Sequence, residues 1–329
     1  MNILSLGNTA HAFKQMYFLW LMFVAYIIAF LASLLGNSVI IHIIRKDNSM
    51  KTTTNYLILN QACTDLVITM AEIMTAIHYS FMDKIWLGGL FGLITCKMFQ
   101  AILFTAPAFS TWILAAIAVD RFYAVTRPFR LSPLSQNLKK IILVLWAWSF
   151  ALTITFVIGS ESFKQIHHSV YCTATNEWTL THFLAFTLDV FLPLIMTVVL
   201  YTIVCLKLWS REVPGEGPNQ NEQQVEAIKI ARKVTIMMVV VVAFYVVCWF
   251  PMFISILLNY VYHVELGNSF SLFFVWLTLF YSGFNPYIYL VFSQNFRNGF
   301  KSTFRRFLIK INVSDVISFR SQSVELEQI

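Results

Sequence analysis

Three acidic residues, Asp65, Glu72 and Asp189, lie within long apolar stretches of the chain. An ionisable side chain is costly in such surroundings, so each one marks a candidate functional site. Asp65 comes about eleven residues into its stretch, roughly 16 Å along a helix, and Ser110 and Asn285 reach a similar depth in their own stretches. Together these three residues offer oxygen ligands for a small cation such as sodium, or a proton held on Asp65. A neutral, hydrogen-bonded Asp65 that only joins helices is an equal alternative.

Glu72 and Asp189 predict a second kind of chemistry, the recognition of a positive charge. Glu72 follows the first aspartate by two helical turns on the same face, and Asp189 lies roughly 15 Å from the outer end of its stretch. Two acidic groups that open toward an outer cavity favour a cationic ligand group, such as an arginine, a lysine or a free amine. The alternative is internal pairing of these acids with a basic residue nearby: His78, Lys97 or His182.

The composition indicates that these residues belong to a membrane protein. The 329-residue chain is 58% hydrophobic and 12% charged, with a mean hydropathy of +0.69, which is too apolar for one soluble core. The apolar stretches match the roughly 20 residues that a helix needs to cross a bilayer, and they do not alternate as the strands of a membrane barrel do. We therefore predict an all-α membrane protein with a seven-transmembrane helix bundle over residues 17–292. The predicted spans are 17–44, 54–79, 96–123, 141–159, 179–208, 234–261 and 269–292.

Basic residues set the orientation of the predicted bundle. Most of the 23 Lys and Arg residues fall in the loops of one side and in the C-terminal segment, which is the pattern of a cytoplasmic face. Residues 1–16 are then a short extracellular N-terminus, and the C-terminus is cytoplasmic in a multi-pass protein of the plasma membrane. The net charge of +7 follows from this asymmetry, so no nucleic-acid partner is invoked.

Residues 293–310 predict an amphipathic helix on the membrane surface. Between Phe296 and Phe307, phenylalanines recur every three or four residues with Arg and Lys between them, a pattern that binds membrane lipids of the inner leaflet. A packed soluble helix is the weaker interpretation, because no soluble domain remains to receive it. Residues 311–329 predict a disordered cytoplasmic tail.

Two cysteines lie on the predicted outer side. Cys96 opens the third span, and Cys172 lies in the outer loop between the fourth and fifth spans. An extracellular location is oxidising, which favours a disulfide between them over two free thiols. Position alone leaves both states open.

The third span ends on the predicted inner side with Asp120-Arg121, and the chain continues there into Arg127-Pro128-Phe129. A lone dipeptide of this kind is best interpreted as a solvated surface pair. The residues around it therefore decide its meaning.

Prolines interrupt three other spans, at Pro193, Pro251 and Pro286. A proline removes a backbone hydrogen bond and lets the helix bend. Asn285, next to Pro286, offers an amide to the freed backbone. Proline kinks are common in membrane helices, so each one alone says little.

Taken in order, these features resemble the rhodopsin-like (class A) G-protein-coupled receptors, over about residues 17–310. A single motif of this length recurs by chance, whereas an ordered set at the spacing of the family hardly does. The markers are Gly36-Asn37, Asn60, Asp65, Cys96, Asp120-Arg121-Phe122, Trp146, Pro193, Tyr201, Cys248-Trp249-Phe250-Pro251 and Asn285-Pro286-Tyr287-Ile288-Tyr289.

The resemblance implies a switch at the inner side. Asp120 would hold Arg121 at rest, and an outward swing of the sixth span would free Arg121 to meet a heterotrimeric G protein. Two tyrosines would then close around the arginine, and a phenylalanine of the inner loop would enter the G protein. Arrestin and receptor kinases are further partners that the family implies. The residues assigned to coupling and switching are Asp120, Arg121, Phe129, Tyr201, Pro251, Asn285, Pro286 and Tyr289.

The resemblance also bears on the two sites left open above. It strengthens the Cys96–Cys172 disulfide, and it implies an allosteric sodium ion at Asp65, Ser110 and Asn285. No other cofactor is expected.

Some residues depart from the family pattern. Phe122 replaces a tyrosine, a change that many members tolerate. No acidic residue directly precedes Ala231, where some members tether the arginine of the third span, so the resting state is less firmly locked. The tail has no cysteine to carry a palmitoyl anchor.

Two residues that other receptor classes need are missing from the sequence, and this restricts the class of ligand. The seventh span has no lysine for retinal, and Leu103 stands where amine receptors carry an aspartate. The segment 55–60 and the run 122–125 are similar to those of neuropeptide receptors, so we predict a neuropeptide ligand. An amine, a lipid and a small metabolite are the alternatives. The predicted ligand contacts are Glu72, Gln100, Leu103, Asp189 and Trp249.

Two other classes of protein are disfavoured. An ion-coupled transporter or channel that uses the three buried acids is a distant alternative, because the sequence shows no inverted repeat. We predict no enzyme activity, since the sequence has no metal-ligand cluster, phosphate loop or nucleophile with a paired base.

Overall fold

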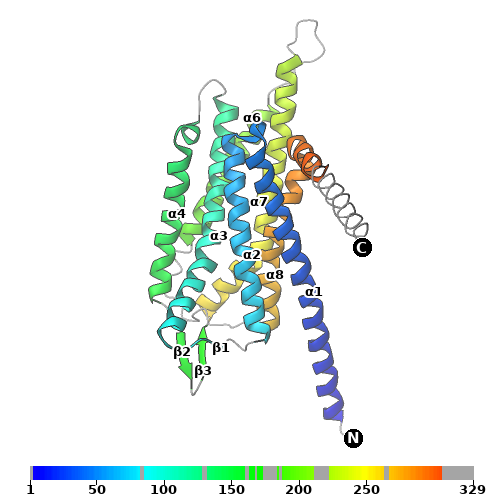
Figure 1. Cartoon of the computed structure of the whole chain (residues 1–329), viewed down its shortest axis with the longest axis vertical. Helices are drawn as coiled ribbons and strands as arrows, with labels where there is room; N and C mark the ends of the chain where they lie inside the picture. Colours follow the sequence, from blue (N-terminus) through cyan, green and yellow to red (C-terminus); the bar gives the residue numbers. More distant parts are fainter. Residues whose placement is uncertain are drawn as a thin grey trace, which may run out of the picture.

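The structure is a computed structural model that describes residues 3–81, 85–127, 132–159, 163–166, 169–172, 184, 187–210, 222–262 and 267–305. Figure 1 shows long helices that run side by side along one axis, with a small sheet at one end.

Within the described residues, seven helices form the bundle, as the sequence predicts. Six of them are long and apolar enough to cross a membrane. The last one has 25 residues and mixes tyrosines, an asparagine and a proline with its apolar residues, and it packs against the first, second and sixth long helices. The helices are α1 (Ile3–Lys46), α2 (Thr53–Phe81), α3 (Gly89–Thr126), α4 (Pro133–Gly159), α6 (Leu192–Trp209), α7 (Glu222–Tyr262) and α8 (Asn268–Phe292).

Several helices are longer than the predicted spans. α1 is helical from Ile3, within the predicted extracellular N-terminus, and α7 begins at Glu222, twelve residues before the predicted sixth span. Hydropathy locates the apolar part of a helix, but good helix formers continue it beyond the lipid. Part of the predicted fifth span, residues 179–183, 185 and 186, lies outside the described residues.

Large apolar side chains point away from the bundle. Trp20 on α1 is 64% exposed and Leu143 on α4 is 69% exposed. Apolar surface of this extent is stable only against another apolar medium. The exposed faces of these helices therefore fit contact with lipid, while α3 lies inside the bundle in contact with α2, α4, α6 and α7.

The chain enters α6 through one turn of π-helix, η2 (Thr187–Phe191). Pro193 follows at the start of α6 and has no amide hydrogen to donate to the preceding turn. A wider turn directly before a proline relieves this mismatch. Pro251 and Pro286, the other two prolines noted in the sequence, lie inside α7 and α8, and each of these helices continues through its proline.

A three-stranded antiparallel sheet covers one end of the bundle. Its strands are β1 (Ile85–Trp86), β2 (Phe163–Ile166) and β3 (Ser169–Cys172), in the order β1-β3-β2. These strands were not predicted from the sequence, because they are too short for a periodic pattern. β3 ends at Cys172, which forms a disulfide with Cys96 of α3 at a Cα–Cα distance of 5.8 Å. The predicted disulfide is thus confirmed, and we call this end of the molecule the disulfide end.

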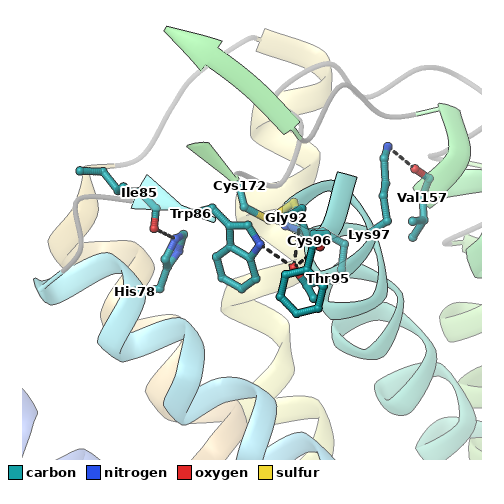
Figure 2. The surroundings of a disulfide bond; sticks show 11 residues. His78, Ile85, Trp86, Gly92, Thr95, Cys96, Lys97, Val157 and Cys172 are labelled. Atoms are coloured by element: carbon teal, nitrogen blue, oxygen red, sulfur yellow. Dashed lines mark hydrogen bonds between the residues drawn. A yellow bond between two sulfur atoms is a disulfide. The ribbon is translucent and has the colours of Figure 1, made fainter. Parts of the chain in front are cut away.

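Side chains fasten the sheet to α2 and α3 (Figure 2). The Trp86 indole donates to the Thr95 hydroxyl at 3.1 Å and packs against His78, whose ring contacts the Ile85 carbonyl at 3.1 Å. The side chain of Lys97 donates to the Val157 carbonyl at 2.6 Å. The Trp86 and His78 contacts hold β1 against α2 and α3, whereas the Lys97 bond joins α3 to α4.

At the other end, the chain turns after α8 into a helix that is described over residues 294–305. Phe296 is buried and stacks on Tyr289 of α8, whereas Phe300 and Phe304 stack on each other and are exposed. Arg297 donates to the Val291 carbonyl at 2.5 Å, near the end of α8. The described part fits the predicted amphipathic helix. Residues 306–310 and the predicted tail, residues 311–329, lie outside the described residues.

α1 and α8 approach each other closely at small residues. A Cβ atom added at Gly36 would lie 3.0 Å from two side-chain carbons of Pro286. The nearby Asn37 amide donates to the Ser282 carbonyl at 3.0 Å, and the Tyr26 hydroxyl donates to the Leu272 carbonyl at 2.7 Å. Close packing of backbones through small residues is a common way for membrane helices to associate.

We predict that Gly36→Leu lowers the thermal stability of the purified protein in detergent. The added side chain would push α1 away from Pro286, and such overpacking costs about 1–3 kcal/mol. Gly267→Leu is the control, since a Cβ atom there meets nothing within 4 Å. Equal melting temperatures for the two variants would contradict this account of the α1–α8 contact.

Candidate functional site

Polar residues lie at three depths in the described part of the bundle, and they form a cluster at two of these depths. The Arg121 cluster, at the end opposite the disulfide, consists of Thr54, Asp120 and Arg121. The Asp65 cluster in the middle of the bundle consists of Gln61, Asp65, Ser110 and Asn285. Nearer the disulfide end, Glu72 and Asp189 lie in separate surroundings.

In the Arg121 cluster, a carboxylate and a hydroxyl hold the guanidinium group. Arg121 Nη2 lies 2.8 Å from Asp120 Oδ2, and it also donates to the hydroxyl of Thr54 at the start of α2. Thr54 in turn donates to Asp120 Oδ2 at 2.5 Å. Asp120 and Thr54 are buried, so the pair is not a solvated surface pair. Thr54 carries no signal of this role in the sequence, since a threonine at a helix start usually indicates a cap.

Among the other predicted switch residues, those that the structure describes lie toward the same end of the bundle or in its core. Tyr201 on α6 and Tyr289 on α8 are buried in the main hydrophobic cluster, and the Tyr289 hydroxyl has no hydrogen-bond partner within the described part of the chain. Pro251 is half-buried on α7. Phe129 lies outside the described residues, so its predicted role stays a prediction.

The Asp65 cluster joins three helices through side-chain amides. Asn285 Nδ2 of α8 donates to Asp65 Oδ2 at 2.9 Å. Gln61 Nε2, one turn before Asp65 on α2, donates to Asp65 Oδ1 at 3.2 Å and to Ser110 Oγ of α3 at 2.6 Å. All four side chains are buried. The structure thus brings the three predicted residues together, with a glutamine between two of them that the sequence analysis did not single out.

This arrangement does not fit a cation site as it stands. A hard cation needs oxygen lone pairs directed at it, whereas amide hydrogens face both oxygens of Asp65. The oxygens of the two amides, Gln61 Oε1 and Asn285 Oδ1, are buried without hydrogen-bond partners among the described residues.

Glu72 and Asp189 accept hydrogen bonds from different partners. Thr278 of α8 donates to Glu72 Oε1 at 2.5 Å, while Glu72 Oε2 is buried without a hydrogen-bond partner in the described residues. Asp189 Oδ1 accepts a hydrogen bond of 2.7 Å from the indole of Trp112 on α3. Of the basic partners considered from the sequence, His78 contacts the Ile85 carbonyl and Lys97 the Val157 carbonyl, and His182 lies outside the described residues.

The remaining predicted ligand contacts lie on α3 and α7. Gln100 is buried under the sheet, and its Nε2 donates to Cys172 Sγ at 3.9 Å. Leu103 is half-buried one turn further along α3. Trp249 is buried on α7, where it stacks between Tyr245 and Phe253. These positions place Gln100 closest to the disulfide.

Comparison with known proteins decides the family. The family described as "7 transmembrane receptor (rhodopsin family)" matches residues 36–289 of the chain. The chain belongs to this family. It is therefore a multi-pass receptor of the plasma membrane, and the predicted resemblance is confirmed.

Individual receptors are also similar to this chain. It is 32% identical over 296 residues to the Substance-P receptors of Mus musculus and Homo sapiens, an alignment that spans 85% of this chain and 70% of each relative. It is 29% identical over 291 residues to the Neuromedin-K receptor of Oryctolagus cuniculus, over 85% of this chain and 60% of the relative.

We predict that Thr54→Val raises the basal signalling of the receptor about fivefold to tenfold. Valine keeps the shape of threonine but removes its hydroxyl. The hydrogen bond that Arg121 donates to this hydroxyl is worth about 1 kcal/mol, which is roughly fivefold in an equilibrium constant, and Asp120 also loses the bond that the hydroxyl donates to it. Basal nucleotide exchange on a G protein, at matched surface expression, measures the effect.

Two control variants separate this effect from general damage. Thr54→Ser keeps the hydroxyl and should behave as the unaltered receptor does. Thr202→Val is the matched control on the exposed face of α6, where the hydroxyl donates to the Val198 carbonyl of its own helix. Basal signalling of Thr54→Val at the level of Thr202→Val would refute the role of Thr54.

Proposed function

We propose that this receptor binds a peptide at the disulfide end, with its N-terminus outside the cell, and activates a heterotrimeric G protein at the Arg121 end. The Arg121 cluster carries the proposal. It places a half-buried guanidinium group near the end of α3, held by Asp120 and by the hydroxyl of Thr54. The proposed orientation agrees with the basic loops.

The ligand class follows from similarity together with one buried charge. Receptors named for the peptides substance P and neuromedin K align with this chain over 85% of its length. Glu72 Oε2 is a buried acceptor without a partner among the described residues, and such an atom is costly unless a ligand supplies a donor. A peptide with an arginine, a lysine or a free amine would supply that donor as a charged hydrogen bond.

The helix over residues 294–305 supports contact with the inner leaflet. Its exposed phenylalanines can enter the lipid, while Lys301 and Arg305 are exposed to anionic headgroups. This division of apolar and basic side chains is typical of a helix that lies in the membrane surface. Arrestin and receptor kinases are proposed partners on family grounds alone.

We predict that Arg121→Ala keeps ligand binding and abolishes activation of the G protein, because the guanidinium group acts only at the inner end. The experiment compares cAMP and calcium responses of expressing cells to a library of amidated peptides, amines and lipids. The control is Arg45→Ala, because Arg45 is an exposed arginine at the same end of the bundle, on α1. Full signalling by Arg121→Ala would contradict the coupling mechanism, and responses only to lipids or amines would contradict the ligand class.

We predict that Glu72→Gln lowers the potency of a basic peptide agonist from that library about tenfold or more, since the ligand loses a charged hydrogen bond. Asp189→Asn removes the same charge at a carboxylate that Trp112 already holds, so its effect should be smaller. Concentration–response curves measure both variants. An equal loss of agonist potency in the two variants would contradict the proposed difference between Glu72 and Asp189. Unchanged potency in Glu72→Gln would exclude Glu72 from the ligand site.

A further inference from the structure

We propose that the side-chain amide of Gln61 takes the place of a sodium ion between Asp65 and Ser110. The Asp65 cluster would then be a permanent link between helices, and sodium would not regulate this receptor through it. This inference concerns the resting structure alone, so it does not depend on which ligand or G protein the receptor uses.

The position of one nitrogen atom carries the proposal. Gln61 Nε2 lies 3.2 Å from Asp65 Oδ1 and 2.6 Å from Ser110 Oγ. A hard cation about the size of Ca²⁺ holds its oxygen ligands at roughly 2.3–2.6 Å. An ion that bridged the same two oxygens would therefore overlap the amide nitrogen.

The amide also supplies the chemistry that an ion would supply. A carboxylate can only accept hydrogen bonds, and the N–H groups of an amide carry the positive ends of their dipoles. The Asn285 amide approaches Asp65 Oδ2 from the other side at 2.9 Å. Each oxygen of Asp65 thus has a donor, one from its own helix α2 and one from α8, before any ion binds.

Entry of a cation would be unfavourable because it would displace the Gln61 amide from its two acceptors, Asp65 and Ser110. Gln61 is fully buried, as are Asp65 and Asn285, and Ser110 is nearly so. If the ion displaced the amide, two hydrogen bonds would break and a buried polar group would lose its partners, which costs more than the bonds themselves are worth in water.

In a competing arrangement, Gln61 binds the sodium ion instead of replacing it. Gln61 Oε1 has no partner among the described residues, and a rotated amide would direct this oxygen at an ion shared with Asp65. Gln61 would then be a sodium ligand, and its removal would weaken sodium binding. The two arrangements predict opposite effects of one substitution.

The test is the thermal stability of the purified full-length receptor, without added ligand, in sodium chloride and in choline chloride at about 0.15 M each. A bound ion stabilises the folded state by mass action. We expect the unaltered receptor to melt at the same temperature in both salts, within about 1 °C. We expect Gln61→Leu to gain a sodium-specific rise of about 2 °C or more, and the added Asp65→Asn substitution to remove that rise.

Two results would overturn the proposal. One is a sodium-specific rise in the unaltered receptor that Asp65→Asn abolishes, which needs no glutamine variant and so remains decisive if Gln61→Leu does not fold. The other is a Gln61→Leu receptor, and a Gln61→Ala receptor made as a second variant, that both stay insensitive to sodium.

Discussion

Lipid offers no hydrogen-bond partner to a polar side chain, and this constraint governs the interior of the bundle. Asp65 shows its effect most directly. The carboxylate lies in the middle of the membrane-spanning part, and amides from Gln61 and Asn285 donate to its two oxygens. Since Gln61 also donates to Ser110, satisfying one charge fixes α2, α3 and α8 relative to one another. The position of α3 then sets where Arg121 lies.

Helices α2 and α3 also contact each other at the Arg121 end. Ser110 and Asp120 lie ten residues apart on α3, roughly 15 Å along the helix, and each bonds to a residue of α2, Gln61 or Thr54. Polar contacts at two depths make α2 and α3 one unit. Ser33 of α1 shares a hydrogen bond of 2.5 Å with Thr69 of α2, and Asn285 of α8 donates to Asp65 of α2, so α1 and α8 are joined to this unit.

α7 is attached in a different way. Its middle packs through the rings of Tyr245 and Trp249, and Tyr245 shares a hydrogen bond of 3.1 Å with Thr111 of α3. At the Arg121 end, Arg232 donates to the Leu208 carbonyl near the end of α6 at 2.9 Å. α7 is thus tied to α6 there, while Arg121 is tied to α2. The predicted swing of α7 can therefore proceed without breaking the bonds that hold Asp65.

The sequence predicted the bundle and the depth of its polar residues well, because apolar length and the cost of buried charge leave few alternatives. Over its described residues each predicted span falls within helical structure that in several cases is longer, and Gln61 links Ser110 to the Asp65 and Asn285 pair. It predicted partners poorly. Thr54 and Gln61 belong to types common on helix surfaces, so only the three-dimensional packing shows that they hold Arg121 and Asp65. The short strands at the disulfide end were missed because two to four residues carry no periodic signal.

The interaction on which this account depends is the amide bridge from Gln61 to Ser110, and a double-mutant cycle measures it most directly. Unfolding free energies of the receptor, Gln61→Leu, Ser110→Ala and the double variant would be compared. The account predicts a coupling energy of about 0.5–3 kcal/mol between the two substitutions. Additive effects, within about 0.3–0.5 kcal/mol, would contradict it.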